Sequence, residues 1–524
     1  MAGPVCSPDW KGAFQKRNAA SELFQLSKGL HPRTAAKGAH MENGPQPELA
    51  EKPARDRRLK GTPASAPLPP DAAIEAHART LLGLRGLDGA LSALPPRAEQ
   101  LWRMDRFAAD VPFTNAMFIP MGQVADIGLL YQAVATVVGR HEALRIRLAV
   151  RRGRVIQIAE DWKVKQLEVT DVLQSELADV RPGQKSAVSA FTQASLDLYA
   201  QDGFRCQAFR DEQGDVTLGL LAHGFFADSW SSQILFREIR AAYEAQKAEA
   251  SAALGPVSQY GQYALAQRQS LDRNLASHLA HWNARLKDVP PSRLPYDRDA
   301  DQTRRGRSFF FTGREEVARL AAVAQESRVS LTILLLAAYQ LALARWSGQR
   351  EILSAAYTAD RVNPRFQSTI GFLVVNMPVL ARIGEGVSFK SFLLDFAKDY
   401  YGSYAHRELS CELYEAIFAP AQPFCSTVFN FIPLQKNFSA GELHAIPSFE
   451  GILTAPDAPR PSIYRDVYLG LSQHSNGMLG KVFYNAGRFT PEAMENFIRH
   501  FRAVIGGIAT GPDATLENLT GRVR

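Results

Sequence analysis

The chain has 524 residues, of which 46% are hydrophobic and 22% charged, a composition typical of a folded globular protein. Residues 1–60 carry +5 of the formal net charge of +7, so a basic nucleic-acid-binding face is not predicted. The sequence shows no 18-residue apolar run and no signal-peptide core, which predicts a cytoplasmic protein without a membrane span. The four scattered cysteines form no C-x-x-C pair, so no metal site is predicted.

The amino-acid pattern divides the chain into four parts. Residues 1–72 are rich in Pro, Gly, Ala and charge, which predicts a disordered basic tail. Residues 73–93 predict a short amphipathic helix and a linker. Helix and strand patterns then alternate through two halves of similar length, residues 94–270 and 271–524. Together they predict a mixed α/β protein of two lobes with a cleft between them.

The individual elements follow from periodicity and from their flanking turn residues. In chain order, we predict helices at 74–87, 127–145, 231–245, 314–327, 331–348 and 491–510. Strands are predicted at 154–160, 216–223, 307–313, 351–359, 428–434 and 467–485.

One segment at a predicted strand-to-helix corner carries two ionisable side chains. Residues 220–231 read LLAHGFFADSWS, with His223 at the end of the strand and Asp228 just before the helix. Ser229 or Ser231 could cap that helix. A histidine and an aspartate at such a corner commonly face a cleft, although a structural hydrogen-bonded pair is the ordinary alternative.

This segment resembles the H-H-x-x-x-D-G-W-S signature of the condensation domains of nonribosomal peptide synthesis. His223 matches the first histidine, but Gly224 stands at the position of the second. Asp228 matches, and Ser229 replaces the family glycine. Five further stretches resemble family motifs in the right order, at 94–107, 139–148, 260–269, 358–380 and 427–433.

The resemblance implies a fold like chloramphenicol acetyltransferase, in which two lobes form a pseudo-dimer around a tunnel. The family joins an acyl thioester on a carrier domain to an amine, sometimes to a hydroxyl. No tightly bound cofactor is expected, because the phosphopantetheine arm of the carrier brings the substrate. The implied partners are acyl or peptidyl carrier domains and a small amine acceptor, with no nucleic acid and no membrane.

The resemblance also implies roles for single residues. The second histidine positions or deprotonates the amine, and Gly224 lacks a side chain for this task, which removes general-base help of roughly 10²–10⁴-fold. His223 is expected to face the core, since side chains alternate along a strand. Asp228 is expected to pair with Arg145, with Arg140 as the other candidate.

Three further residues are expected to contact substrate through the same resemblance: Asn376, Trp230 and Ser231. For Asn376, a turn residue at the end of a strand is the alternative.

Three functions remain open. The first is an acyltransferase that works in trans and forms an amide bond by positioning its substrates, which alone can contribute roughly 7–11 kcal/mol. The second is an inactive condensation-like platform that binds carrier domains or recruits tailoring enzymes. The third is an acyltransferase that uses coenzyme A thioesters.

Overall fold

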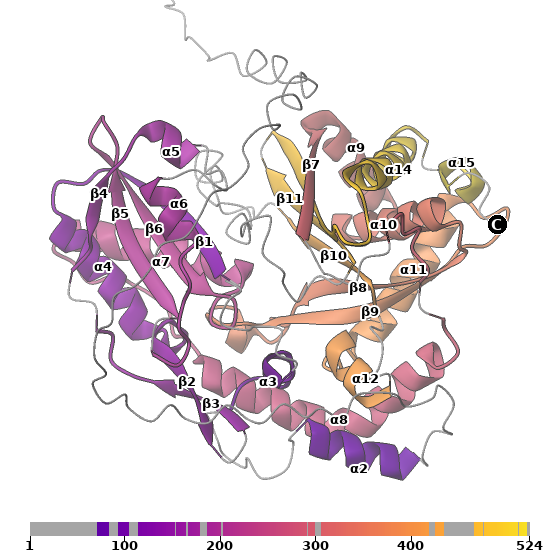
Figure 1. Cartoon of the computed structure of the whole chain (residues 1–524), viewed down its shortest axis with the longest axis horizontal. Helices are drawn as coiled ribbons and strands as arrows, with labels where there is room; N and C mark the ends of the chain where they lie inside the picture. The colour runs from indigo at the N-terminus through magenta and orange to yellow at the C-terminus, as the bar shows by residue number, and fades with distance from the viewer. Residues whose placement is uncertain are drawn as a thin grey trace, which may run out of the picture. The chain divides into compact units, whose positions relative to one another are not determined.

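The computed structural model shows a mixed α/β fold (Figure 1). Its buried apolar side chains form two principal hydrophobic cores. The fold class predicted from the sequence is confirmed. The predicted tail lies outside the described residues, apart from its last two positions. The structure describes residues 71–82, 93–103, 114–151, 154–163, 166–178, 186–200, 203–290, 292–298, 305–418, 425–433, 466–474, 476–511 and 513–520.

The first half of the chain is built on a four-stranded sheet with the order β1-β6-β5-β4. Alternate residues of β6 face different cores, as the pleat of a strand requires. Leu220 belongs to the core shared with α4 and α7, whereas Leu221 belongs to a smaller core shared with α6. The bounds of these elements are β1 Thr114–Gln123, α4 Ile127–Arg140, β4 Val169–Asp171, α5 Gln174–Ala178, α6 Ala187–Thr192, β5 Phe204–Arg210, β6 Asp215–His223 and α7 Ser229–Lys247. A separate hairpin pairs β2 (Ile146–Arg151) with β3 (Arg154–Ala159).

The second half is built on a six-stranded sheet with the order β7-β12-β11-β10-β8-β9. The helices α9, α10 and α14 lie on one side of this sheet (Figure 1). Their packing is direct, since Tyr339 of α10 lies 5.4 Å from Phe429 of β10 between ring centroids. The bounds are β7 Arg305–Gly313, α9 Arg314–Glu326, α10 Leu331–Ser347, β8 Glu351–Ala359, β9 Val374–Arg382, α11 Phe389–Tyr404, α12 Cys411–Phe418, β10 Thr427–Ile432, β11 Val467–His474, β12 Gly477–Asn485, α14 Pro491–Thr510 and α15 Leu516–Thr520.

Two predicted elements differ from the structure. The single strand predicted at 467–485 is wrong, because the chain reverses at Gly477 and forms the antiparallel pair β11 and β12. Gly477 has φ +151°, and a Cβ there would lie 2.3 Å from the carbonyl oxygen of Thr312 in β7, so the close approach of this position to β7 requires glycine. The helix predicted at 127–145 ends earlier, at Arg140, and continues only as a 3-10 turn over Glu142–Arg145.

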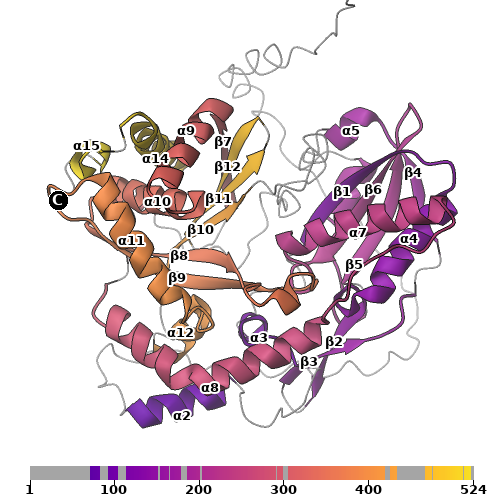
Figure 2. The ribbon, with the colours of Figure 1, turned by 180° about the vertical axis from the view of Figure 1, so that it is seen from behind.

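Helix α8 (Tyr260–Leu286) belongs to both halves of the fold (Figure 2). Its first turns place Tyr263 in the core of the first half, and its later turns place Leu275 in the core of the second half. The division predicted between residues 270 and 271 therefore falls inside one continuous helix.

Two short helices from the start of the described chain pack against α8. Helix α2 (Asp71–Leu81) buries Ile74 and Ala78 in the core of the second half. Helix α3 (Pro96–Arg103) is held by Glu99, whose buried carboxylate contacts three arginines, Arg103, Arg154 and Arg268.

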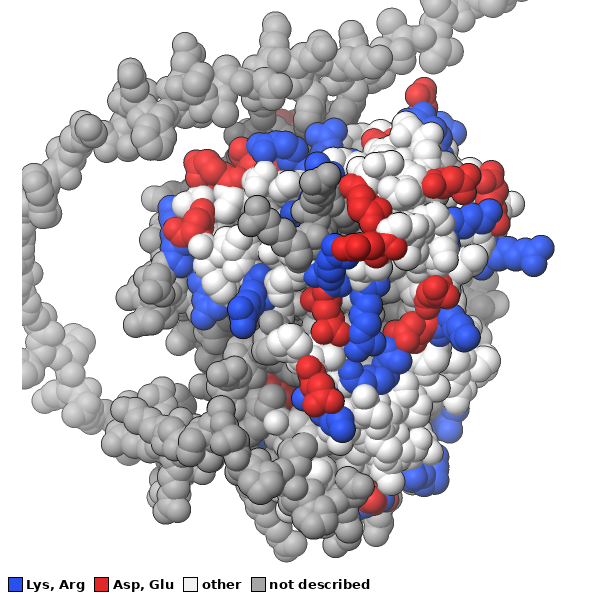
Figure 3. All heavy atoms as spheres, turned by 90° about the vertical axis from the view of Figure 1, so that its right-hand side faces the viewer, with Lys and Arg blue, Asp and Glu red and all other residues white. Residues whose placement is uncertain are grey.

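Within the described residues, no single helix has the length and apolar character needed to cross a membrane. Helices α9 and α10 reach that threshold only together, and they are bent by 105° relative to one another. On the face shown in Figure 3, acidic and basic side chains are interspersed.

Candidate functional site

The candidate site is the corner between β6 and α7, which includes His223, Gly224 and Asp228. The apolar run before the corner makes β6 a buried strand, and its last residue His223 pairs in register with Thr114 of β1. The chain then turns tightly, since the carbonyl of His223 accepts hydrogen bonds from the amides of Phe226 (2.8 Å) and Ala227 (3.1 Å). Helix α7 begins one residue after Asp228.

His223 is a buried, neutral imidazole. Its Nδ1 accepts a hydrogen bond from the amide of Phe225 at 3.2 Å, which places the ring proton on Nε2. The ring packs on the aromatic rings of Phe225 and Phe226, with centroids 5.2 and 6.2 Å away. Burial lowers the pKa of His223 to about 3. An imidazole with so low a pKa is a weak base at neutral pH, so His223 is a poor replacement for the absent second histidine.

Gly224 follows in the turn and is buried. Among the described residues, the glycines with positive φ are Gly122, Gly214, Gly348, Gly371, Gly386 and Gly477. Gly224 is not one of them, so its backbone conformation does not itself demand glycine.

Asp228 is an anchor that joins the two halves of the fold. Its carboxylate forms a bidentate ion pair with Arg361, with distances of 2.7 Å to Nη1 and 2.9 Å to Nη2. Both side chains are buried, with 3% and 2% exposure. The same carboxylate caps α7 by accepting the amide of Ser231 at 2.8 Å, so the helix cap is Asp228 and neither Ser229 nor Ser231.

The ion pair predicted between Asp228 and Arg145 is wrong. The guanidinium of Arg145 donates to the carbonyl oxygens of Glu160 (2.8 Å) and Gly139 (3.4 Å). The other candidate, Arg140, pairs with Glu238 of α7 at 3.0 Å. Arg361, which follows β8, reaches Asp228 because the chain returns from the second half to the first at this point.

The segment that follows Arg361 completes the anchor. The amide of Leu373 donates to Asp228 at 3.1 Å, and the amide of Asp228 donates to the carbonyl of Gly371 at 3.2 Å. A Cβ on Gly371 would lie 2.3 Å from the ring of the buried Tyr260, so glycine is required for this close approach. Phe372 and Leu373 enter the core of the first half.

Two of the residues predicted to contact substrate lie beside this anchor. Ser231 is fully buried, and its hydroxyl lies 2.7 Å from Asp228 Oδ1 and accepts the amide of Gly371 at 3.1 Å. These bonds give Ser231 a structural role. Trp230 is 36% exposed, its indole N–H donates to the carbonyl of Gln367 at 2.9 Å, and its ring lies 5.6 Å from the guanidinium of Arg361. Trp230 thus presents an aromatic surface at the corner.

Asn376, the third such residue, lies in β9 in a buried polar network. Its Nδ2 donates to Glu412 of α12 at 3.1 Å, and Glu412 pairs with Arg97 of α3 at 3.0 Å. Burial alone would lower the pKa of Arg97, but the carboxylate of Glu412 raises it above its usual value. Asn376 is 2% exposed, and its Oδ1 has no hydrogen-bond partner among the described residues. A substrate contact at this oxygen stays a prediction.

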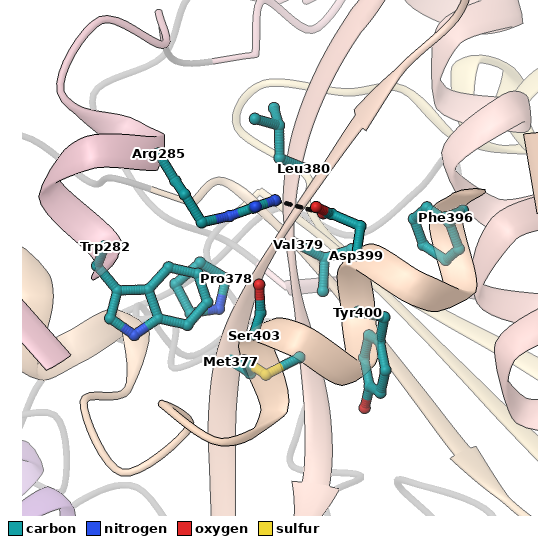
Figure 4. Close-up of a pocket in the computed structure, with 10 residues that line it drawn as sticks. All are labelled: Trp282, Arg285, Met377, Pro378, Val379, Leu380, Phe396, Asp399, Tyr400 and Ser403. Carbon is teal, nitrogen blue, oxygen red and sulfur yellow. Dashed lines mark hydrogen bonds and ion pairs between the residues drawn. The ribbon is translucent and has the colours of Figure 1, made fainter. Parts of the chain in front are cut away.

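Two hollows open elsewhere, on the second half of the fold. One, of about 250 Å³, lies between α8, β9 and α11, where an ion pair between Arg285 and Asp399 spans it beside Trp282 and Tyr400 (Figure 4). The other, of about 280 Å³, lies on strands β10, β11 and β12 and includes Lys481. None of the residues predicted for the site lines either hollow.

The fold and the anchored corner together define a class of protein: a mixed α/β fold with two hydrophobic cores and a candidate site where β6 meets α7. The family model described as "Condensation domain" matches residues 113–521. The chain therefore belongs to the condensation-domain family of nonribosomal peptide synthesis, and the resemblance found in its motifs is confirmed.

Individual relatives agree with this assignment. The chain is 26% identical over 476 residues to the dimodular nonribosomal peptide synthase of Bacillus subtilis (strain 168), covering 84% of this chain but only 20% of that protein. A match to a linear gramicidin synthase protein of Brevibacillus parabrevis is also 26% identical and covers 80% of this chain but 8% of that protein. The chain thus spans a small part of the length of these relatives.

Solved structures show the same fold. The condensation domain of the monacolin K polyketide synthase MokA superposes with a TM-score of 0.67 at 18% identity, with coverage of 81% of this chain and 98% of that one. The X-domain from teicoplanin biosynthesis, in its complex with OxyB, superposes with a TM-score of 0.64 at 18% identity and coverage of 82% and 97%.

Sequence reasoning missed three site features. Arg361 could have been considered as a partner of Asp228, because it lies in the stretch 358–380 that already resembled a family motif. The pair of Arg97 and Glu412 spans 315 residues and has no local signal. Lys481 was not singled out, because it lies within residues 467–485, which were predicted to form one strand.

Proposed function

We propose that this chain is an acyltransferase that joins an acyl thioester, presented on the phosphopantetheine arm of a carrier domain acting in trans, to an amine. The observation that supports it most is the anchored corner, in which Asp228 and Arg361 fix the β6–α7 turn although the second histidine is absent. These bonds hold the corner in one conformation, which a reaction that depends on the positioning of its substrates requires.

In the proposed reaction, the amine nitrogen attacks the thioester carbonyl, a C–N bond forms and the C–S bond breaks. The proton that the amine loses ends on the departing sulfur, directly or through water. Between His223 and Ser231, all described, the ionisable side chains are His223 and Asp228. The first is neutral and buried, and the second is engaged by Arg361, so this segment supplies shape and not proton transfer. Proximity and orientation then carry the rate enhancement, which can reach roughly 7–11 kcal/mol.

An amine acceptor suits this mechanism better than a hydroxyl. A neutral amine carries a lone pair and attacks before it loses a proton, whereas a hydroxyl needs a base as it attacks. The proposed enzyme is therefore selective for amines.

The alternative is a platform that binds proteins without catalysis. Gly224 supports it, and so does the similar fold of an X-domain that forms a complex with OxyB. In this reading, the anchored corner preserves the fold and no chemistry takes place there.

Mass spectrometry of a carrier protein loaded with an acyl group separates the two. The carrier is incubated with a panel of amines, with and without this chain, and the amide product is quantified over time. Amide formation that depends on the chain supports the acyltransferase, and the same assay with coenzyme A thioesters tests whether a carrier is needed. Binding of the loaded carrier without product would overturn the acyltransferase and leave the platform.

A further inference from the structure

Two cysteine side chains meet inside the core of the second half. Cys411 is the first residue of α12, and Cys425 lies two residues before β10. Their sulfur atoms are 3.5 Å apart, and both side chains are buried with 0% exposure. Cys206, the other described cysteine, lies in β5 of the first half. Among the described cysteines, Cys411 and Cys425 are therefore the pair in contact.

The contact places the two thiols close to the geometry of a covalent bond. The S–H of Cys425 donates to the carbonyl oxygen of Ser354 in β8 at 3.5 Å, which leaves its sulfur to accept the S–H of Cys411. A disulfide bond is about 2.05 Å long, so the two sulfurs need to approach by roughly 1.5 Å. Cys411 begins its helix and Cys425 precedes its strand, so a shift of this size leaves the hydrogen bonds within both elements in place.

The chain neighbours of both thiols are polar. Ser410 directly precedes Cys411, and Ser426 directly follows Cys425. Both serine hydroxyls are buried and have no hydrogen-bond partner among the described residues. Buried hydroxyls of this kind favour a small polar molecule beside them. Hydrogen peroxide resembles water in size and polarity, so it can be accommodated near these sulfurs.

We propose that Cys411 and Cys425 form a modification site, at which a peroxide oxidises the two thiols to an intrachain disulfide. One thiolate attacks the peroxide, the O–O bond breaks, and a sulfenic acid forms as hydroxide leaves. The second thiol then attacks the sulfenic sulfur, the S–S bond forms, and the hydroxyl departs as water with the thiol proton. The two thiols lose two electrons in total, and the peroxide gains them.

The disulfide would tie the start of α12 to the start of β10. Glu412, the residue after Cys411, accepts a hydrogen bond from Asn376 of β9 at 3.1 Å and pairs with Arg97 of α3 at 3.0 Å. The bond would therefore restrain the carboxylate that holds both side chains. A cross-link also lowers the conformational entropy of the unfolded chain, so the oxidised protein should be the more stable form. The inference does not depend on the proposed function, because it concerns the two thiols alone.

Mass spectrometry of the full chain tests the site directly. The folded protein is treated with hydrogen peroxide, denatured, alkylated with iodoacetamide and digested with trypsin. Residues 408–436 contain no Lys or Arg before Lys436, so both cysteines fall in one tryptic peptide, and Cys206 falls in another. We expect the 408–436 peptide to lose both alkylation sites together with two hydrogen atoms, while Cys206 stays alkylated. Dithiothreitol should restore both sites, since a disulfide is reversible and the higher oxides of cysteine are not.

A synthetic peptide of residues 408–436 serves as the control for the oxidant. If that peptide is bridged while the folded chain keeps both cysteines alkylated, the proposal is overturned. Sulfinic or sulfonic acid at Cys411 or Cys425, or a bond from either of them to Cys206, would overturn it as well.

Thermal denaturation adds a second measurement. Oxidation should raise the melting temperature of the unmodified chain by about 2–6 °C. This shift should vanish in Cys411→Ala and Cys425→Ala and persist in Cys206→Ala, the matched control. Each variant is compared with itself before and after oxidation, so a variant that is less stable from the outset still gives an answer. A melting temperature that falls when the bridge forms would show that the bond does not fit the native fold, and would also overturn the proposal.

Discussion

Among single residues, Asp228 connects the site to both halves of the fold. Its two carboxylate oxygens receive hydrogen bonds from Arg361, from the amide and hydroxyl of Ser231 and from the amide of Leu373. Since the pair is almost fully buried, removing one partner leaves an uncompensated charge.

We therefore predict that Asp228→Ala and Arg361→Ala each lower the free energy of unfolding by about 3–5 kcal/mol, measured by urea denaturation. The double variant should lose clearly less than the sum of the two, because the residues interact directly. Arg145→Ala is the matched control, since the guanidinium of Arg145 donates to the backbone carbonyls of other residues. Its effect should add to that of Asp228→Ala, and non-additivity there would contradict the assignment of Arg361.

The second single-residue prediction concerns Gly224 and the rate of amide formation. Its φ is not positive, so Gly224→His has no backbone strain to overcome. If only the base is missing, the new imidazole should raise amide formation by up to roughly 10²–10⁴-fold. The rate should rise with pH through an apparent pKa near the unperturbed value of about 6.5, because the neutral imidazole is the active form.

Gly224→Ala serves as the control, since it adds a Cβ without an imidazole, and it should leave the rate near that of the unmodified chain. A folded Gly224→His variant that binds the loaded carrier and forms no more product than Gly224→Ala would contradict a role for this position in catalysis.

Among the secondary-structure elements, α2 is the first described one that packs on the body of the fold. It places Ile74 and Ala78 in the core of the second half, and the guanidinium of Arg268 donates to the carbonyl of Leu82 just after the helix. Fully burying a large aliphatic side chain contributes about 1.5–3 kcal/mol.

Two deletions distinguish the contribution of α2 to thermal stability from that of the sequence before it. Removing residues 1–70 should change the melting temperature little, as expected from the composition of that region. Removing residues 1–82 should lower it by several degrees, because the buried face of α2 is lost. Differential scanning calorimetry of both proteins tests this, and a large loss on the shorter deletion would contradict the sequence-based expectation.

For the whole molecule, the buried His223 and the half-buried His281 contribute to how stability depends on pH. Burial lowers the pKa of His223 to about 3 and that of His281 to about 4. Below a pH of about 6.5 the unfolded chain takes up protons at these residues and the folded chain does not, so the unfolded state is favoured. Stability is thus predicted to fall as pH decreases from about 6.5 toward 3.

His223 alone should cost about 2 kcal/mol of unfolding free energy by a pH of about 5, relative to about 7.5. Urea denaturation across this range measures the slope, and His223→Gln should flatten it because glutamine does not titrate. A slope that is unchanged in His223→Gln would contradict the low pKa of this histidine.

Local patterns along the chain were enough to predict the fold class and about half of the described helices and strands, and the order of the motifs indicated the family. The long helix α8 was not predicted. Amphipathic and apolar periods identified strands such as β6 and helices such as α7, since burial of a side chain leaves a local trace in the pattern. They also located the corner with His223, Gly224 and Asp228, because those residues lie close to one another in the chain. The reversal between β11 and β12 was missed although the sequence marks it, since polar residues and the dipeptide Asn476–Gly477, a typical hairpin-turn signal, separate the two apolar runs.

Which residues meet across the chain became visible only in the folded molecule. Asp228 pairs with Arg361, 133 residues away, and not with Arg145, which lies closer in sequence. Asn376 donates to Glu412, which in turn pairs with Arg97, and Lys481 becomes part of the wall of a pocket. Local patterns report whether a side chain is buried but carry no record of its partner. That partner is fixed by how α8 and the segment after Arg361 bring the two cores together.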